Sequence, residues 1–374
     1  MRSPARVVIA GLGDSGLLTA THLAGHRRTV EVVGVSAKPG LVSGQELGMR
    51  LARPDEWARD YRIGFDRFRR LTGVRTVHGE LSGLDLDDRR VAVHLPDGQT
   101  RHEPYDVLVI ATGVTNGFWR RPGLQTDDDV TAELADAHER LASASTVVVI
   151  GGGAAAVSSA LQIALRWPAT TVALCFPGDR ALPRHHRRTW DHVRRRLVAA
   201  GVDLRPGHRA QFPDGEPPAQ ITAGPVSWAT GQPDTEAEAV LWAVGRVRPN
   251  TGWLPGELLD DDGFVRVGPT LQTPTRPEVF AVGDVAATDS LRSSARNRAD
   301  KLLAANILAH LGGGRMRDYR PPRSRWGSVL GVEPDGLRVF APSGRPFRFP
   351  AWTVHSLLQP WIVRRGIYGG VRGQ

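Results

Sequence analysis

The stretch that decides the fold is Gly11-Leu-Gly-Asp-Ser-Gly16, and a second glycine-rich stretch, GGGAAA, follows at positions 151–156. Each comes directly after a short apolar run, RVVIA at 6–10 and TVVVI at 146–150, and each precedes a segment with helical patterning. A strand, a glycine turn and a helix in this order let the backbone approach a pyrophosphate and aim a helix N-terminus at its charge. Two such units predict two dinucleotide sites on one chain.

Length and composition are those of a soluble globular chain with more than one domain. At 374 residues the chain exceeds one ordinary core, and two or three domains are expected. No run of about 18 apolar residues occurs, so we expect no membrane-spanning helix. The short basic N-terminus leads directly into the apolar run at 6–10, which favours a strand over a signal peptide. A cytoplasmic location is therefore predicted.

Cysteine usage and net charge limit the chemistry. Cys175 is the only cysteine, which excludes an internal disulfide and a C-x-x-C redox pair, and its apolar neighbours predict a buried thiol. No metal site is expected. The net charge of +9 favours an acidic membrane surface or an acidic redox protein as partner, or reflects a solvated basic surface. No zinc finger, helix-turn-helix or aromatic RNA-binding motif accompanies it, so we expect no nucleic-acid partner.

Further apolar runs repeat the alternation of strands and helices. Residues 105–113 form a continuous apolar run of the kind that is buried on both faces of a parallel sheet. Two later runs, 239–245 and 279–284, end in Gly and in Gly-Asp. The pattern predicts an α/β fold with two Rossmann-like dinucleotide-binding domains. The Arg-, Pro- and Trp-rich remainder, about 320–374, predicts a small C-terminal α+β segment.

Six motifs in sequence order resemble those of the two-dinucleotide-binding FAD flavoproteins, the pyridine nucleotide-disulphide oxidoreductases. They are GLGDSG at 11–16, YDVLVIATG at 105–113, VIGGG at 149–153, GDRALP at 178–183, WAVGRVRPN at 242–250 and VFAVGD at 279–284. The resemblance covers about residues 5–320 and implies FAD as bound cofactor and NAD(P)H as co-substrate. It also implies that an FAD domain is interrupted by an NAD(P)H domain and followed by a C-terminal domain, at residues 1–117 with 256–320, 118–255 and 321–374.

The resemblance assigns residues to both cofactors. For FAD they are glycines and polar residues of the first turn, of the strand ends and of the Gly-Asp motif: Gly11, Gly13, Ser15, Gly16, Ser36, Lys38, Ala111, Thr112, Gly113, Gly283 and Asp284. For NAD(P)H they are Gly151, Gly153, Ala156 and Gly245. No side chain is assigned as a catalytic acid or base. Two cations near the flavin are candidates for stabilising its reduced, anionic form: Arg298 and Lys301.

Three positions depart from the family pattern: Ser36, Phe176 and Arg298. Arg298, followed by Ala299, stands where type II NADH dehydrogenases usually carry a glutamine pair, which weakens the case for a quinone. Ser36 stands where an acid normally binds the FAD adenosine ribose. Phe176 stands near the position where an acid normally favours NAD, and no adjacent arginine is present to bind the 2′-phosphate of NADP. Four arginines follow a few residues later, either as phosphate ligands or as an exposed basic start of a helix: Arg180, Arg184, Arg187 and Arg188. The choice between NADH and NADPH stays open.

The position of the missing redox thiol indicates the branch. Related reductases and oxidases carry cysteine near the position of Ser43, so a thiol relay is excluded. The cysteine-free branch that remains resembles type II NADH dehydrogenases and apoptosis-inducing-factor-like quinone reductases, whose end segment often lies on a membrane. Aromatic and aliphatic residues alternate with arginines at 352–365, a mixture suited to an anionic interface. Pro360 is expected to break any long helix there.

The leading hypothesis is an FAD-dependent NAD(P)H oxidoreductase that passes electrons from the nicotinamide, through the flavin, to a quinone-like or other small acceptor. The alternatives are a flavin-dependent tailoring oxidase or monooxygenase, an NAD(P)H-responsive redox sensor, and a ferredoxin-type reductase with an acidic redox partner. A homodimer and a peripheral position at the inner face of the membrane stay open.

Overall fold

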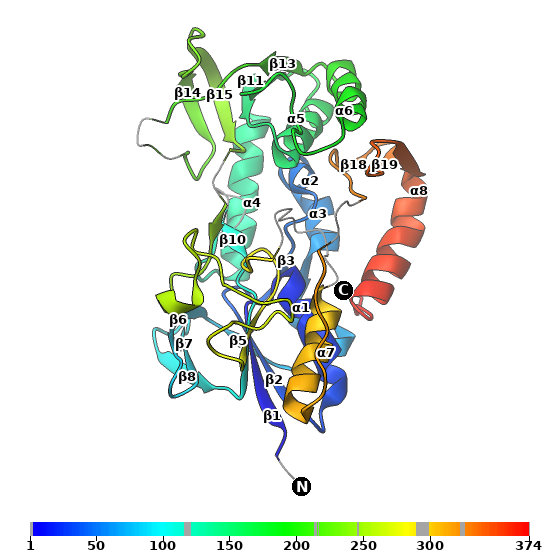
Figure 1. The fold of residues 1–374 in the computed structure, drawn as a ribbon. Coiled ribbons are helices and arrows are strands. Elements are labelled where there is room, and N and C mark those ends of the chain that lie inside the picture. The colour runs from blue at the N-terminus through cyan, green and yellow to red at the C-terminus, as the bar shows by residue number, and fades with distance from the viewer. Residues whose placement is uncertain are drawn as a thin grey trace.

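The computed structural model describes residues 3–115, 121–212, 215, 217–244, 247–288, 299–321 and 326–373. Two five-stranded sheets organise this part of the chain and lie toward opposite ends of the molecule (Figure 1). Segments far apart in sequence build the first sheet, and one continuous stretch builds the second. This arrangement confirms the predicted α/β fold with two Rossmann-like units. The predicted boundaries at 117, 255 and 320 stay predictions.

The first sheet is wholly parallel and has the order β17-β9-β1-β2-β5. Its strands are β1 (Ala5–Ala10), β2 (Val30–Ser36), β5 (Arg75–His78), β9 (Val107–Ile110) and β17 (Val279–Ala281). The aliphatic strand β9 is buried along its whole length, as a central parallel strand should be. Helices α1 (Asp14–Leu23) and α7 (Ala299–Gly312) pack side by side on one face of this sheet.

The second sheet has the order β13-β12-β11-β15-β14 and is parallel except for β14. Its strands are β11 (Thr146–Ile150), β12 (Thr171–Phe176), β13 (Asp203–Pro206), β14 (Thr222–Val226) and β15 (Thr235–Trp242). Helix α4 (Asp127–Ala142) leads into it and begins with a capping box between Thr126 and Asp129. Helices α5 (Ala154–Arg166) and α6 (Arg187–Ala199) share an apolar cluster with β11 and β12.

Shorter strands and helices lie between the main elements along the chain. The strands are β3 (Gly40–Val42), β4 (Arg62–Gly64), β6 (Glu80–Asp85), β7 (Arg90–His94), β8 (Thr100–Pro104), β10 (Val114–Thr115) and β16 (Arg248–Pro249). The helical segments are α2 (Leu47–Ala52), α3 (Pro54–Tyr61), η1 (Ala24–His26), η2 (Phe65–Arg67), η3 (Arg69–Leu71) and η5 (Gly256–Leu258). Helix α2 crosses α5 so closely that a Cβ on Gly48 would lie 2.5 Å from the carbonyl oxygen of Ser158. This close crossing joins the two units.

The C-terminal segment is an antiparallel sheet followed by a helix. Its strands are β18 (Val332–Glu333), β19 (Gly336–Phe340) and β20 (Pro346–Pro350). Helix α8 (Ala351–Thr353) then continues as the π-type segment η6 (Val354–Ile367), which runs along the outside of the molecule in red (Figure 1). The predicted break at Pro360 is wrong, since the π-type segment continues through the proline despite the backbone N–H that the proline lacks. Among the helices in the described ranges, none is long and apolar enough to span a bilayer.

Candidate cofactor-binding site

A pocket of about 630 Å³ opens where the strands of the first sheet end. Residues that follow β1, β2, β9 and β17 form its wall, because the carboxyl ends of parallel strands meet at one edge of a sheet. Ten of the eleven residues predicted for FAD line it: Gly11, Gly13, Ser15, Ser36, Lys38, Ala111, Thr112, Gly113, Gly283 and Asp284. The eleventh, Gly16, lies in the first turn of α1 behind the wall. Separate segments of the chain therefore meet at one pocket.

The first glycine turn has two glycines required by packing and one that opens on the pocket. Gly11 has φ +103°, and a Cβ there would lie 2.6 Å from the carbonyl oxygen of Ala111. A Cβ on Gly16 would overlap the carbonyl oxygen of Gly11. Gly13, the N-cap of α1, has open space around its Cβ position, and no side chain caps the helix. The N-terminal N–H groups of α1 thus face a cradle suited to a pyrophosphate.

The second glycine turn repeats this design. Gly151 has φ +139°, and a Cβ there would overlap the carbonyl oxygen of Ala243. Gly153 is the N-cap of α5 and again has open space around its Cβ position and no side-chain cap. Ala156 is fully buried in α5. Gly245, also predicted for this site, lies outside the described residues.

Ser43, near the position predicted for a redox thiol in relatives, has a structural role here. Its hydroxyl donates to Asp14 Oδ1 at 3.0 Å, and the backbone N–H of Gly44 donates to Asp14 Oδ2 at 3.4 Å. The Tyr368 hydroxyl donates to Asp14 Oδ1 at 3.4 Å. Asp14 lines the pocket, so the C-terminal end of the chain contacts a side chain of the pocket wall. Asp14 lies within the first motif, but no sequence pattern pointed to Tyr368.

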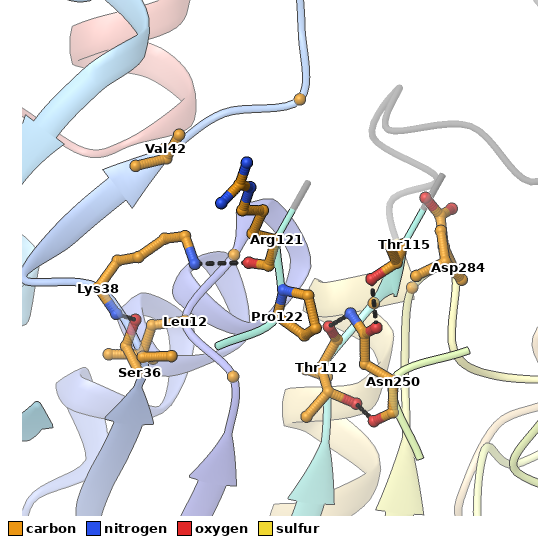
Figure 2. Close-up of a pocket in the computed structure, with 18 of the residues that line it drawn as sticks. Leu12, Ser36, Lys38, Val42, Thr112, Thr115, Arg121, Pro122, Asn250 and Asp284 are labelled. Atoms are coloured by element: carbon orange, nitrogen blue, oxygen red, sulfur yellow. Dashed lines mark hydrogen bonds between the residues drawn. The ribbon is translucent and has the colours of Figure 1, made fainter. Parts of the chain in front are cut away.

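Lys38 crosses one end of the pocket. Its Nζ donates to the carbonyl oxygen of Arg121 at 2.7 Å, and its backbone N–H donates to Ser36 Oγ at 3.2 Å (Figure 2). The Nζ also donates to the carbonyl oxygen of Gly123 at 3.3 Å. Burial lowers the pKa of Lys38 to about 8, although the nearby Glu133 carboxylate acts in the opposite direction. Lys38 therefore holds the linker between the two units against the pocket.

Asn250 fixes the other end, where the chain passes between the units. Its Nδ2 donates to the backbone carbonyl oxygen of Thr112 at 3.0 Å. The backbone carbonyl oxygen of Asn250 in turn accepts from Thr112 Oγ1 at 2.8 Å. The Thr115 hydroxyl donates to Asn250 Oδ1 at 2.7 Å. Asp284 lies beside this group, across the pocket from Lys38 (Figure 2). Asn250 is the last residue of the sequence motif at 242–250, but the motif did not predict its hydrogen bonds to Thr112 and Thr115.

Neither of the two residues predicted to stabilise the charge of the reduced flavin is observed at the pocket. Arg298 lies outside the described residues. Lys301 is exposed on α7 and does not line the pocket, whereas the preceding Asp300 lines it and shares a hydrogen bond of 3.1 Å with His22 Nε2. A cation that the sequence did not single out, Arg50, does line the pocket, and its guanidinium lies 5.1 Å from the centroid of the Trp57 ring.

Three relatives are similar over much of the chain. Oxidoreductase ptaL of Pestalotiopsis fici is 25% identical over 342 residues, covering 88% of this chain and 84% of its own. The FAD-dependent oxidoreductase FVFD30 of Flammulina velutipes is 27% identical over 216 residues, covering 56% and 64%. The type II NADH:quinone oxidoreductase Ndh of Mycobacterium tuberculosis is 26% identical over 291 residues, covering 68% and 62%.

The fold is also that of a solved structure with a bound pyridine nucleotide. The water-forming NADH oxidase of Lactobacillus brevis, bound to NADH, superposes with a TM-score of 0.67 at 17% identity, covering 90% of this chain and 74% of its own. At this identity the likeness shows the fold alone. The prediction of FAD and a pyridine nucleotide as cofactors is supported by the family match. The family model described as pyridine nucleotide-disulphide oxidoreductase matches residues 5–305, and the chain belongs to that family.

Proposed function

We propose that this chain is an FAD-dependent enzyme that oxidises NAD(P)H and delivers the electrons to a quinone-like or other small acceptor. The observation that carries the proposal is the pocket of the first unit, in which an uncapped helix N-terminus, Lys38 and Asp284 line one cavity. An anionic dinucleotide fits this combination of a phosphate cradle, a cation and a hydroxyl-binding carboxylate. Family membership supports FAD as the occupant and NAD(P)H as the reductant.

The residues of the chain bind and orient the two nucleotides. Bound FAD supplies the two-electron redox chemistry. We assign its pyrophosphate to the N–H groups beside Gly13 and its ribityl hydroxyls to Asp284. Ser36 and Lys38 are assigned to its adenosine end. The open turn at Gly153 is assigned to the pyrophosphate of NAD(P)H. The contribution of the protein is then position and electrostatics, since hydride transfer needs no side-chain base.

The acceptor receives electrons without a thiol intermediate. Cys175 is the only cysteine of the chain, and burial raises the pKa of its thiol to about 12. A thiolate is therefore not formed at neutral pH. In an acceptor assay, we expect oxidation of NAD(P)H with a water-soluble quinone and none with glutathione disulfide. Turnover with the disulfide but not with any quinone would contradict this proposal.

The affinity for FAD is expected to depend on pH through Lys38. The pKa of Lys38 is about 8 in the free protein, and the phosphates of FAD raise the pKa when they bind in the same pocket. Binding therefore takes up a proton above pH 8. We expect a constant affinity below that pH and a loss of about tenfold per pH unit above it, until the pKa of the complex is reached. Fluorescence titration of the free protein with FAD measures this profile.

The other lysine of the chain, Lys301, provides a matched control. Lys38→Met should weaken FAD binding at pH 7 and flatten the profile, whereas Lys301→Met, at an exposed position, should leave both unchanged. A sloping profile that persists in Lys38→Met would show that another group causes the pH dependence.

The helix at the C-terminus is proposed to contact an anionic membrane. Four of its apolar side chains are strongly exposed: Trp352 at 65%, Leu357 at 47%, Trp361 at 56% and Ile362 at 53%. The Arg365 guanidinium lies 5.0 Å from the centroid of the Trp361 ring. Aromatic and aliphatic groups next to arginine suit the boundary between acyl chains and acidic headgroups. A peripheral location, and access of a membrane quinone, would follow.

Vesicle sedimentation checks this contact. The protein should bind vesicles that contain phosphatidylserine, and the double change Trp352→Ser with Trp361→Ser should reduce binding by at least about tenfold. Trp326→Ser is the control, because Trp326 is 60% exposed but lies before β18, outside the helix. Equal losses in both variants, or equal binding to purely zwitterionic vesicles, would argue against this surface.

A further inference from the structure

The end of β12 lacks the side chain that normally favours NADH. An acid at the end of the second strand binds the ribose 2′-hydroxyl of NADH, whereas a nearby arginine accommodates the 2′-phosphate of NADPH. Here the strand ends with Phe176, whose side chain is buried and packs edge-on against Trp190 with ring centroids 5.6 Å apart. Pro177 follows and has no backbone N–H to donate. This position thus offers a ribose hydroxyl neither a carboxylate nor an amide donor.

The loop that follows, residues 177–186, is fastened against the second glycine turn. The Leu182 N–H donates to the carbonyl oxygen of Gly152 at 2.7 Å, and the Gly207 N–H donates to the carbonyl oxygen of Gly178 at 3.1 Å. Leu182 has φ +56°, an unfavourable backbone conformation for leucine that the surrounding contacts must hold. The loop therefore has a fixed position beside the turn assigned to the nucleotide.

This loop and the start of α6 concentrate positive charge. Four arginines lie here, all partly or fully exposed: Arg180, Arg184, Arg187 and Arg188. The Arg180 guanidinium donates to the carbonyl oxygens of Pro183 at 3.1 Å and His185 at 3.4 Å, which position it while leaving its charge uncompensated by these neutral partners. The first turn of α6 contains no acidic residue.

The start of α6 has a local charge distribution that favours an anion. The N-terminal end of a helix carries partial positive charge and favours acidic side chains, so arginines in the first turn of α6 oppose the helix dipole. Asp179 is the one acid within the loop and is exposed. The His186 side chain caps this helix by accepting from the Arg188 backbone N–H at 3.1 Å, so the guanidinium groups are what would stabilise a phosphate beside the loop.

We propose that NADPH, rather than NADH, is the reductant, and that Arg180 and Arg184 recognise its ribose 2′-phosphate. The inference rests on the proposed function and specifies its nucleotide. Loss of a charge-assisted hydrogen bond weakens binding by about tenfold to a hundredfold. The kcat/KM for NADPH should therefore exceed that for NADH by at least about tenfold. NADPH should have the lower KM and the two nucleotides a similar kcat, because the 2′-phosphate takes no part in hydride transfer.

Binding of nucleotide fragments tests the proposal independently of turnover. In calorimetric titrations of the FAD-loaded protein, 2′,5′-ADP should bind at least about tenfold more tightly than 5′-AMP. Arg180→Ala combined with Arg184→Ala should abolish this difference and leave 5′-AMP binding unchanged. Arg194→Ala is the matched control, since it removes an exposed arginine from the middle of α6. Its fragment affinities should equal those of the parent.

The outcomes separate this inference from the function on which it rests. Equal binding of both fragments by the parent protein, or flavin reduction by NADH as efficient as by NADPH, would overturn the NADPH assignment alone. A preference for 2′,5′-ADP that survives in the double variant would overturn the roles of Arg180 and Arg184. Failure of both nucleotides to reduce the flavin would instead overturn the proposed oxidoreductase.

Discussion

A Gly13→Asp variant is expected to fold normally and to purify without bound FAD. The Cβ position of Gly13 is open and its backbone is extended, so the new side chain fits without strain. Aspartate is also a favourable N-cap and satisfies the N–H groups at the start of α1. Those are the groups assigned to the pyrophosphate, and the carboxylate would repel it. A like-charge contact of this kind costs several kcal/mol, so FAD affinity should fall by about a hundredfold or more.

Flavin absorbance per chain and thermal unfolding measure the two halves of this prediction. The variant without FAD should unfold at or above the temperature of the parent without FAD, because the helix gains a cap. A yellow Gly13→Asp protein with one FAD per chain would show that the cofactor does not use this turn. Gly153→Asp serves as the control for any general effect of an added N-cap aspartate.

Gly153→Asp is expected to remain fully yellow and to lose reduction by NAD(P)H. Gly153 is the N-cap of α5 in the second unit, its Cβ position is also open, and no side chain caps the helix. The carboxylate would occupy the cradle assigned to the nucleotide pyrophosphate. By the same like-charge cost, kcat/KM for the nucleotide should fall by about a hundredfold or more.

Stopped-flow reduction and a chemical reductant distinguish the cause of such a loss. Dithionite should reduce the flavin of Gly153→Asp as completely as that of the parent, because the FAD site is untouched. Unimpaired reduction by NAD(P)H would contradict the assignment of the second turn. Together the two aspartate variants separate one dinucleotide site from the other.

Most of the first site could be predicted because its residues follow buried strands. Gly11, Ala111 and Gly283 come after β1, β9 and β17, and Ser36 is the last residue of β2. Parallel strands place their carboxyl ends at one edge of the sheet. Apolar runs and glycine turns are local signals, so the strands and their ends are readable from sequence. The fold class follows from the order of these units along the chain.

The remainder depends on contacts between distant segments. Tyr368, near the C-terminus, contacts Asp14, and Lys38 contacts the backbone at Arg121. No local sequence pattern predicts either contact. The continuous helix through Pro360 was not predicted because a proline removes a backbone hydrogen bond and normally ends or kinks a helix, whereas here the π-type segment continues without that bond. Sequence patterns therefore predict the individual helices and strands better than the contacts between them.

An anaerobic titration of the FAD-loaded protein with NADPH tests the central proposal most directly. One equivalent of NADPH per chain should bleach the oxidised flavin completely, and addition of a water-soluble quinone should restore the yellow colour. A protein that takes up no FAD, or one whose flavin neither NADPH nor NADH can reduce, would contradict the proposed oxidoreductase.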